Sequence, residues 1–135
     1  MLKHPPSSSP PPRILVVDDE PDLREELCEW LALRGLPAVM AGDVEGALGV
    51  LRVLHGIETV LTDIRLGSAS GLDLVRRARR DPALAGRHLH FALMTGQTDL
   101  TDHARDEIAE LDAVLLAKPI DLGRLLGLLQ APRAA

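Results

Sequence analysis

The sequence predicts an α/β domain in which helices cover both faces of a parallel five-stranded sheet. Five short apolar runs alternate with stretches of helical periodicity, which is the pattern of successive βα units. The runs are apolar at nearly every position, as in strands that are buried on both faces. The length of 135 residues fits one domain with its own core.

The expected strands and helices alternate along the whole chain. Pro21 follows the first apolar run at a position where a helix can begin, and Asp81-Pro82 is expected to end the third helix. Gly46 and Gly49 each weaken the second helix by about 1 kcal/mol. Strands are expected at residues 14–17, 37–41, 59–63, 90–94 and 113–117, and helices at 21–35, 43–55, 72–80, 98–110 and 122–130.

The two ends of the chain fall outside this pattern. Residues 1–12 are rich in proline and serine and are expected to form a disordered arm. Residues 131–135 are expected to be a short tail, which leaves residues 13–130 as a single domain without internal repeats. Because the chain ends just after the fifth helix, we expect a stand-alone domain with no attached DNA-binding or enzymatic output.

The composition excludes several classes of protein. A net charge of -5, with one Trp, one Phe and no Tyr, disfavours nucleic-acid binding. The run Arg76, Arg77, Arg79 and Arg80 is therefore interpreted as a solvated helix face. No apolar run is long enough to span a membrane, and no signal peptide is present. With a single cysteine, Cys28, the sequence predicts a cytoplasmic protein.

Polar residues follow four of the five expected strands. Asp18 and Asp19 follow the first, Asp63 ends the third, and Thr95 and Lys118 follow the fourth and fifth. The carboxyl ends of parallel strands share one edge of the sheet, where ligands bind. We therefore expect these five side chains to converge.

The converging residue types fit phosphoryl transfer onto Asp63. Three neighbouring carboxylates repel one another, and a hard divalent cation relieves this; Mg2+ is expected, with Mn2+ as the alternative. Lys118 supplies a positive charge for phosphoryl oxygens. Thr95 offers a hydroxyl donor, and Gly96 leaves room for the phosphoryl group. A carboxylate nucleophile would form an acyl phosphate.

Four segments of the chain resemble the receiver domain of two-component response regulators. They are Ile-Leu-Val-Val-Asp-Asp-Glu-Pro-Asp at residues 14–22, the segment Thr-Asp-Ile-Arg-Leu-Gly-Ser-Ala-Ser-Gly-Leu-Asp-Leu at 62–74, Met-Thr-Gly at 94–96 and Ala-Lys-Pro at 117–119. The resemblance extends from Arg13 to about Gln130. It implies a flavodoxin-like (βα)5 three-layer fold with strand order 2-1-3-4-5.

The resemblance also implies a role for each site residue. It assigns Asp63 as the phosphoacceptor, Thr95 as the switch hydroxyl and Lys118 as the ammonium that pairs with phosphate, with a cis bond before Pro119. It assigns the Mg2+ ligands as Asp18, Asp19, Asp63 and the backbone carbonyl of Arg65.

Two residues depart from the usual receiver pattern. Gly67 stands where many receivers have a proline after the phosphoacceptor, so we expect a looser loop. Leu115 stands where receivers commonly carry an aromatic residue that rotates with the threonine. The departure at Leu115 leaves open how phosphorylation reaches the surface.

We interpret the chain as a phosphorylatable switch rather than an enzyme. Its expected partners are a histidine kinase or histidine phosphotransfer protein and a downstream protein target, and a homodimer is possible. Once phosphorylated, the domain would change its protein contacts or pass the phosphoryl group along a relay. One alternative is a Mg2+-dependent phosphatase with Asp18 as nucleophile, for which Glu20 is a poor second acid. Another is a degenerate receiver that serves only for binding or dimerisation. The acids at 18–20 would also suit the start of the first helix.

Overall fold

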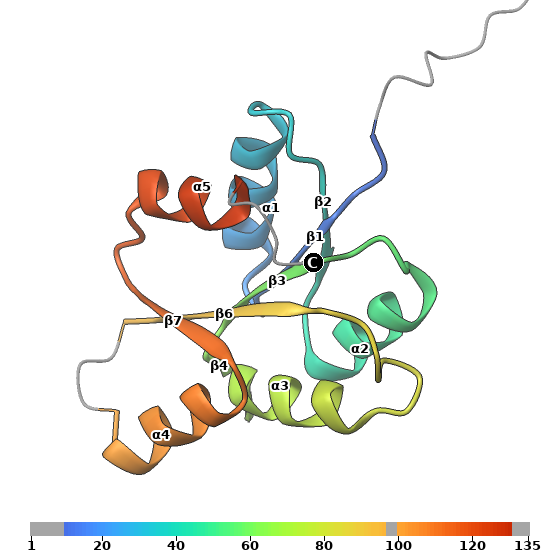
Figure 1. Cartoon of the computed structure of the whole chain (residues 1–135). Helices are drawn as coiled ribbons and strands as arrows, with labels where there is room; N and C mark the ends of the chain where they lie inside the picture. Colours follow the sequence, from blue (N-terminus) through green and yellow to red (C-terminus); the bar gives the residue numbers. More distant parts are fainter. Residues whose placement is uncertain (1–9, 97–99, 131–135) are drawn as a thin grey trace, which may run out of the picture.

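The protein is represented by a computed structural model that describes residues 10–96 and 100–130. Its centre is a five-stranded parallel sheet in the order β2-β1-β3-β6-β7 (Figure 1). The strands are β1 (Ile14–Val17), β2 (Ala38–Ala41), β3 (Thr59–Asp63), β6 (His90–Thr95) and β7 (Ala113–Ala117). The helices are α1 (Pro21–Ala32), α2 (Val44–Val53), α3 (Gly71–Arg80), α4 (Asp102–Glu110) and α5 (Leu122–Gln130).

The order of the strands confirms the predicted topology. If only the five strands of this sheet are numbered in chain order, β6 and β7 become the fourth and fifth strands, and the order is the flavodoxin-like 2-1-3-4-5. β1 lies between β2 and β3, and all pairs in this sheet are parallel. The chain therefore reverses its direction of winding after β2, which places the ends of β1 and β3 beside each other.

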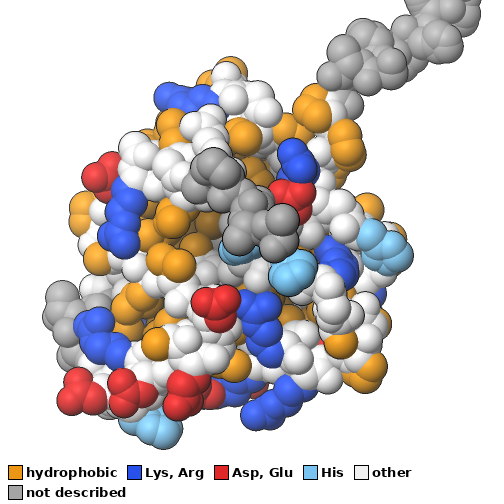
Figure 2. Space-filling view, viewed as in Figure 1, with side chains coloured by type: hydrophobic (Ala, Val, Ile, Leu, Met, Phe, Trp, Pro, Cys, Tyr) orange, Lys and Arg blue, Asp and Glu red, His pale blue; other side chains and the backbone are white. Residues whose placement is uncertain are grey.

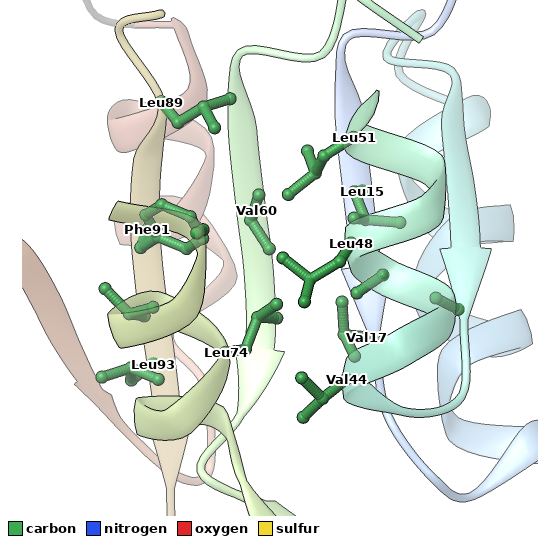
Figure 3. Packing of buried hydrophobic residues seen from close by; sticks show 14 of the residues in the cluster. Leu15, Val17, Val44, Leu48, Leu51, Val60, Leu74, Leu89, Phe91 and Leu93 are labelled. Carbon is green, nitrogen blue, oxygen red and sulfur yellow. The ribbon is translucent and has the colours of Figure 1, made fainter. Parts of the chain in front are cut away.

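The helices form a layer on each face of the sheet (Figure 1). Neighbouring residues of each central strand point to opposite faces: Leu15 belongs to the cluster that contains α2, α3 and Ile108 of α4, whereas Val16 packs with Leu31 of α1 and Leu125 of α5. Figure 3 shows part of the first cluster between the sheet and its helices. Burial on both faces accounts for the uninterrupted apolar runs.

Short polar side chains fix the starts of several helices. The Asp43 carboxylate accepts the Gly46 N–H at 2.7 Å, and the Ser70 hydroxyl accepts the Asp73 N–H at 3.0 Å. Thr101 caps α4 in the same way, so this helix begins at Asp102 rather than at the expected residue 98. Residues 97–99 lie outside the described part of the chain.

One pair of strands was not expected from the sequence. β4 (Arg65–Leu66) and β5 (Ala69–Ser70) form a two-stranded antiparallel sheet directly after β3. Leu66 pairs with Ala69, so the connection is the two residues Gly67-Ser68. Gly67 has a φ of +63°, which suits the first central position of a hairpin turn. The loop expected to be looser at Gly67 contains this hairpin turn, and its looseness relative to receivers with a proline stays a prediction.

The arginines of α3 lie on a partly solvated face, and three of them also contact neighbouring elements, which the sequence did not predict. Arg76 forms a two-pronged ion pair with Glu107 of α4, and Arg77 pairs with a glutamate of α2. Arg79 donates to the carbonyl of Leu111 at 3.1 Å and lies over the ring of Phe91. Figure 2 shows basic and acidic side chains close together where α3 and α4 lie in Figure 1.

The arm and tail are described only in part. Residues 1–9 of the arm expected at 1–12, and all of the tail at 131–135, lie outside the described residues. Within residues 10–96 and 100–130, no helix has the length and apolar character needed to cross a bilayer.

Candidate functional site

A polar pocket lies at the carboxyl edge of the sheet. It encloses about 540 Å³ and is formed by the segments that follow β1, β3, β6 and β7. Its lining residues are Asp19, Glu20, Asp63, Ile64, Arg65, Gly67, Gly96 and Lys118. Five of the predicted site residues therefore line one pocket, whereas Asp18 and Thr95 are buried and are not among its lining residues.

Asp63 is held by a contact on each carboxylate oxygen. Lys118 Nζ donates to Asp63 Oδ2 at 2.6 Å, and the backbone N–H of Arg65 donates to Oδ1 at 3.0 Å. The side chain of Asp63 is 13% exposed and that of Lys118 is 34% exposed, so the pair is partly accessible from the pocket. The ion pair joins the ends of β3 and β7, as the sequence predicted.

Asp18 is the most buried of the three acids, at 5% exposure. Its Oδ1 accepts the N–H of Glu20 at 2.9 Å. Burial raises the pKa of Asp18 above its ordinary value, and the nearby charges of Asp63 and Asp19 raise it further, against the lowering effects of the Glu20 hydrogen bond and Lys118. The predicted repulsion among the carboxylates is therefore present.

Asp19 is exposed and is held by the hairpin. Its Oδ2 accepts the backbone N–H of Gly67 at 3.1 Å. This contact ties the loop after β1 to the loop after β3.

Thr95 and Gly96 occupy the end of β6. Thr95 is 3% exposed, and its carbonyl oxygen accepts the N–H of Lys118 at 2.7 Å. This hydrogen bond joins the ends of β6 and β7, and the peptide bond from Lys118 to Pro119 is cis, as expected. A Cβ added at Gly96 would meet no atom within 4 Å, so the pocket has space there.

The donor set fits a hard divalent cation in its chemistry. The acids near Asp63 supply only oxygen, which suits Mg2+, and their mutual repulsion favours a cation. As the side chains stand, however, no group of three His, Cys, Asp or Glu residues within the described ranges is close enough to hold a metal ion. Asp18, Asp19 and Asp63 each accept a backbone N–H instead.

A comparison with known families decides the identity. The response regulator receiver domain matches residues 14–130, which is nearly the whole described chain. The chain belongs to the response regulator receiver family. Receivers are the phosphoacceptor domains of two-component signalling.

Curated relatives share the receiver but are longer proteins. The transcriptional regulatory protein AruR of Pseudomonas aeruginosa is 37% identical over 95 residues, which are 67% of this chain and 37% of AruR. The response regulator protein PilR of the same organism is 36% identical over 115 residues, covering 84% of this chain and 24% of PilR. The chain thus spans about a quarter to two fifths of the length of these relatives.

Solved receiver structures match over almost their full length. A response regulator receiver protein from Pseudomonas putida is 37% identical, with a TM-score of 0.79 over 90% of this chain and 97% of that protein. A CheY-like receiver domain from Methylobacillus flagellatus is 30% identical, with a TM-score of 0.75 over 89% of this chain and 97% of that domain. These matches confirm the fold.

Two contributors to the site were missed by sequence reasoning. Gly67 contacts Asp19 through its N–H, and Arg24 Nη1 donates to the carbonyl of Asp18 at 2.9 Å. The two-residue Gly-Ser turn was a detectable signal for the hairpin. Nothing in the sequence indicated the contact made by Arg24, because its partner is a backbone atom of another segment.

Proposed function

We propose that this receiver accepts a phosphoryl group on Asp63 from a histidine kinase or a histidine phosphotransfer protein. The observation that carries the proposal is the 2.6 Å ion pair between Asp63 and Lys118 at the pocket. It holds the carboxylate oxygen next to the ammonium that would neutralise the charge of an incoming phosphoryl group.

The proposed reaction transfers one phosphoryl group between two side chains. A carboxylate oxygen of Asp63 forms a bond to phosphorus while the bond from phosphorus to the donor histidine nitrogen breaks. The histidine keeps the electron pair of that bond, and Asp63 becomes an acyl phosphate. Lys118 then pairs with a phosphoryl oxygen, and the space beside Gly96 accommodates the group.

The residues proposed to hold Mg2+ are Asp18, Asp19, Asp63 and the carbonyl of Arg65. A bound Mg2+ supplies charge neutralisation to the phosphoryl oxygens. The need for it is supported by the crowded carboxylates, because Asp63 and Asp19 both raise the pKa of Asp18. Rotation of the Asp19 and Asp63 carboxylates would be needed to form the ligand set.

The proposed output is a change in protein contacts or onward transfer of the phosphoryl group. The face formed by α4, β7 and α5 is the proposed responding surface, and Leu115 on β7 packs partly buried against the cluster beneath α4. Some relatives are named as DNA-binding regulators, such as MtrA of Mycolicibacterium smegmatis. For this domain we propose protein partners, because three of the four arginines on α3 (Arg76, Arg77 and Arg79) are engaged within the fold.

Access from the pocket favours Asp63 over Asp18 as the phosphorylated residue. Both residues are buried, at 9% and 5% exposure, but only Asp63 lines the pocket. This supports the receiver proposal over the alternative phosphatase with Asp18 as nucleophile.

Intact-mass measurement tests the proposal directly. The wild-type protein with Mg2+ and a small phosphodonor, such as phosphoramidate, is expected to gain one phosphoryl group, and Asp63→Asn is expected to gain none. Omission of Mg2+ should suppress the gain in the wild type. A phosphoryl group on the Asp63→Asn protein, or none on the wild type, would contradict the assignment.

A further inference from the structure

We infer that Thr62 is a positioning residue for the proposed phosphoryl transfer, because its hydroxyl fixes the peptide group of Asp63. The Thr62 hydroxyl donates to the backbone carbonyl of Asp63 at 3.0 Å, and Thr62 is 0% exposed. This inference rests on the proposed function, since it concerns how the proposed phosphoacceptor is held. The contact is to the backbone, so it persists whichever way the Asp63 carboxylate turns during the reaction.

The peptide group between Asp63 and Ile64 lies at the point where β3 extends past β1. Its N–H, on Ile64, donates to the carbonyl of Met94 on β6 at 2.8 Å. In a trans peptide the carbonyl points the opposite way, and on that side the pairing of β1 with β3 ends at Val17 and Thr62. A buried carbonyl without a hydrogen bond is costly, and the Thr62 hydroxyl supplies that bond.

The start of α3 leaves room for this hydroxyl and encloses it. Thr62 faces the α3 side of the sheet, as Val60 does two residues earlier. A Cβ added at Gly71 would lie 2.4 Å from the Asp63 carbonyl oxygen and 3.0 Å from the Thr62 hydroxyl oxygen. With glycine in that place the two groups fit, and water would have to displace packed atoms to replace the hydroxyl as donor.

The position of this peptide group determines where the Asp63 carboxylate lies. Its oxygens contact the N–H of Arg65 at 3.0 Å and Lys118 Nζ at 2.6 Å. Without the Thr62 hydroxyl, the peptide group would turn toward another donor, and the carboxylate would move relative to Lys118. A displacement of about 1 Å at a reacting group can slow a reaction by about 100-fold.

Phosphorylation of three variants tests the inference. With Mg2+ and phosphoramidate, Thr62→Val is expected to gain the phosphoryl group about tenfold more slowly than the wild type in time-resolved intact-mass spectra, because valine keeps the shape but lacks the hydroxyl. Thr62→Ser keeps the hydroxyl and should react within about twofold of the wild-type rate.

Thr59→Val is the matched control and should react at the wild-type rate. Thr59 is a buried threonine at the opposite end of the same strand, at 7% exposure. Equal rates for Thr62→Val and the wild type, or equal slowing in Thr62→Val and Thr62→Ser, would overturn the role of the hydroxyl.

A second measurement requires no variant. In 1H NMR spectra of the wild-type protein without phosphodonor, the Thr62 hydroxyl proton should exchange slowly with solvent and show an NOE to the α protons of Gly71. A Thr62 hydroxyl that exchanges as fast as those of exposed serines and threonines would overturn the inference while leaving the proposed function intact. If instead the wild type gains no phosphoryl group, the proposed function itself fails.

Discussion

The Asp63 carboxylate receives its two contacts from two different segments of the chain. Lys118 comes from the end of β7, and the N–H of Arg65 comes from the loop that follows Asp63 itself. One contact therefore depends on the tertiary fold, and the other is local. Together they set the direction in which the carboxylate faces the pocket.

Gly71 packs so closely against the backbone of Asp63 that the structure leaves no space for a side chain at this position. A Cβ at this position would lie 2.4 Å from the carbonyl oxygen of Asp63 and 2.9 Å from Leu93 Cδ2. The N–H of Gly71 also donates to the carbonyl of Ile64 at 2.8 Å. The start of α3 thus lies against the backbone of Asp63.

We expect Gly71→Ala to lower the free energy of unfolding by about 2 to 3 kcal/mol, because backbone must shift to admit the methyl group. Gly49→Ala is the matched control. Gly49 lies in α2 with nothing within 4 Å of an added Cβ, so this change should raise stability by about 0.5 to 1 kcal/mol. Urea denaturation measures the free energy of unfolding of both variants. An equal change in Gly71→Ala and Gly49→Ala would contradict the steric explanation.

The types of the site residues and the meeting of Asp63 with Lys118 were predictable, but the contact between Asp19 and Gly67 was not. Asp63 and Lys118 were identifiable because each ends an apolar run, and the topology of a parallel sheet brings such ends together. The contact between Asp19 and Gly67 depends on a hairpin whose two strands have only two residues each. Strands this short carry no periodic pattern.

At the scale of elements, α4 is held to α3 largely by polar contacts. Of the residues of α4, only Ile108 is buried. Arg76 binds both carboxylate oxygens of Glu107, and Arg79 reaches the carbonyl of Leu111 just after the helix. The position of α4 therefore depends on an ion pair that lies partly in solvent.

The ion pair makes stability depend on pH. The hydrogen bond from Arg76 holds the pKa of Glu107 below its ordinary value of 4.5. The stabilisation is therefore complete above pH 4.5 and is lost as the pH falls through the lower pKa of the folded state. We expect Glu107→Gln to have a lower urea midpoint than the wild type at pH 7, with the difference shrinking below pH 4.5.

Glu110→Gln, at an exposed position of the same helix, is the control and should change the midpoint little at either pH. A difference between Glu107→Gln and the wild type that stays constant from pH 7 to pH 3.5 would show that the ion pair does not couple to protonation.

The sequence predicted the helices better than their mutual contacts. Periodicity identified α3 and α4, but Arg76 and Glu107 are 31 residues apart, and a single sequence does not reveal such pairs. An arginine-rich helix in an acidic chain favoured a solvated face. The face is partly solvated, and its ion pairs could be identified only with the neighbouring helix in place.

For the whole molecule, the two-sided sheet was the most predictable feature. Residues such as Leu15 and Val16 pack into clusters on opposite faces, so every position of β1 is apolar. A strand with one solvated face would alternate instead. The strand order followed from the family resemblance rather than from periodicity, because periodicity says nothing about which strands are neighbours.

The crowded acids should lower the stability of the metal-free protein. We expect Asp18→Asn to raise its melting temperature by about 2 to 5 °C, because one buried charge is removed while the asparagine oxygen can still accept the N–H of Glu20. Mg2+ should raise the melting temperature of the wild type and have a smaller effect on the variant.

Asp106→Asn is the control for this measurement, since Asp106 is exposed on α4. It should leave both the melting temperature and the Mg2+ response unchanged. Equal Mg2+ shifts in Asp18→Asn and the wild type would contradict Asp18 as part of the cation site.

The pairing of Lys118 with Asp63 has a practical consequence. The chain contains two lysines, and the other is Lys3 near the start. Within the folded domain, an amine-selective acylating reagent therefore has one side-chain target, and that target is the ion-pair partner of Asp63, the proposed phosphoacceptor. The extent of labelling at this single amine gives a chemical readout of what occupies the pocket.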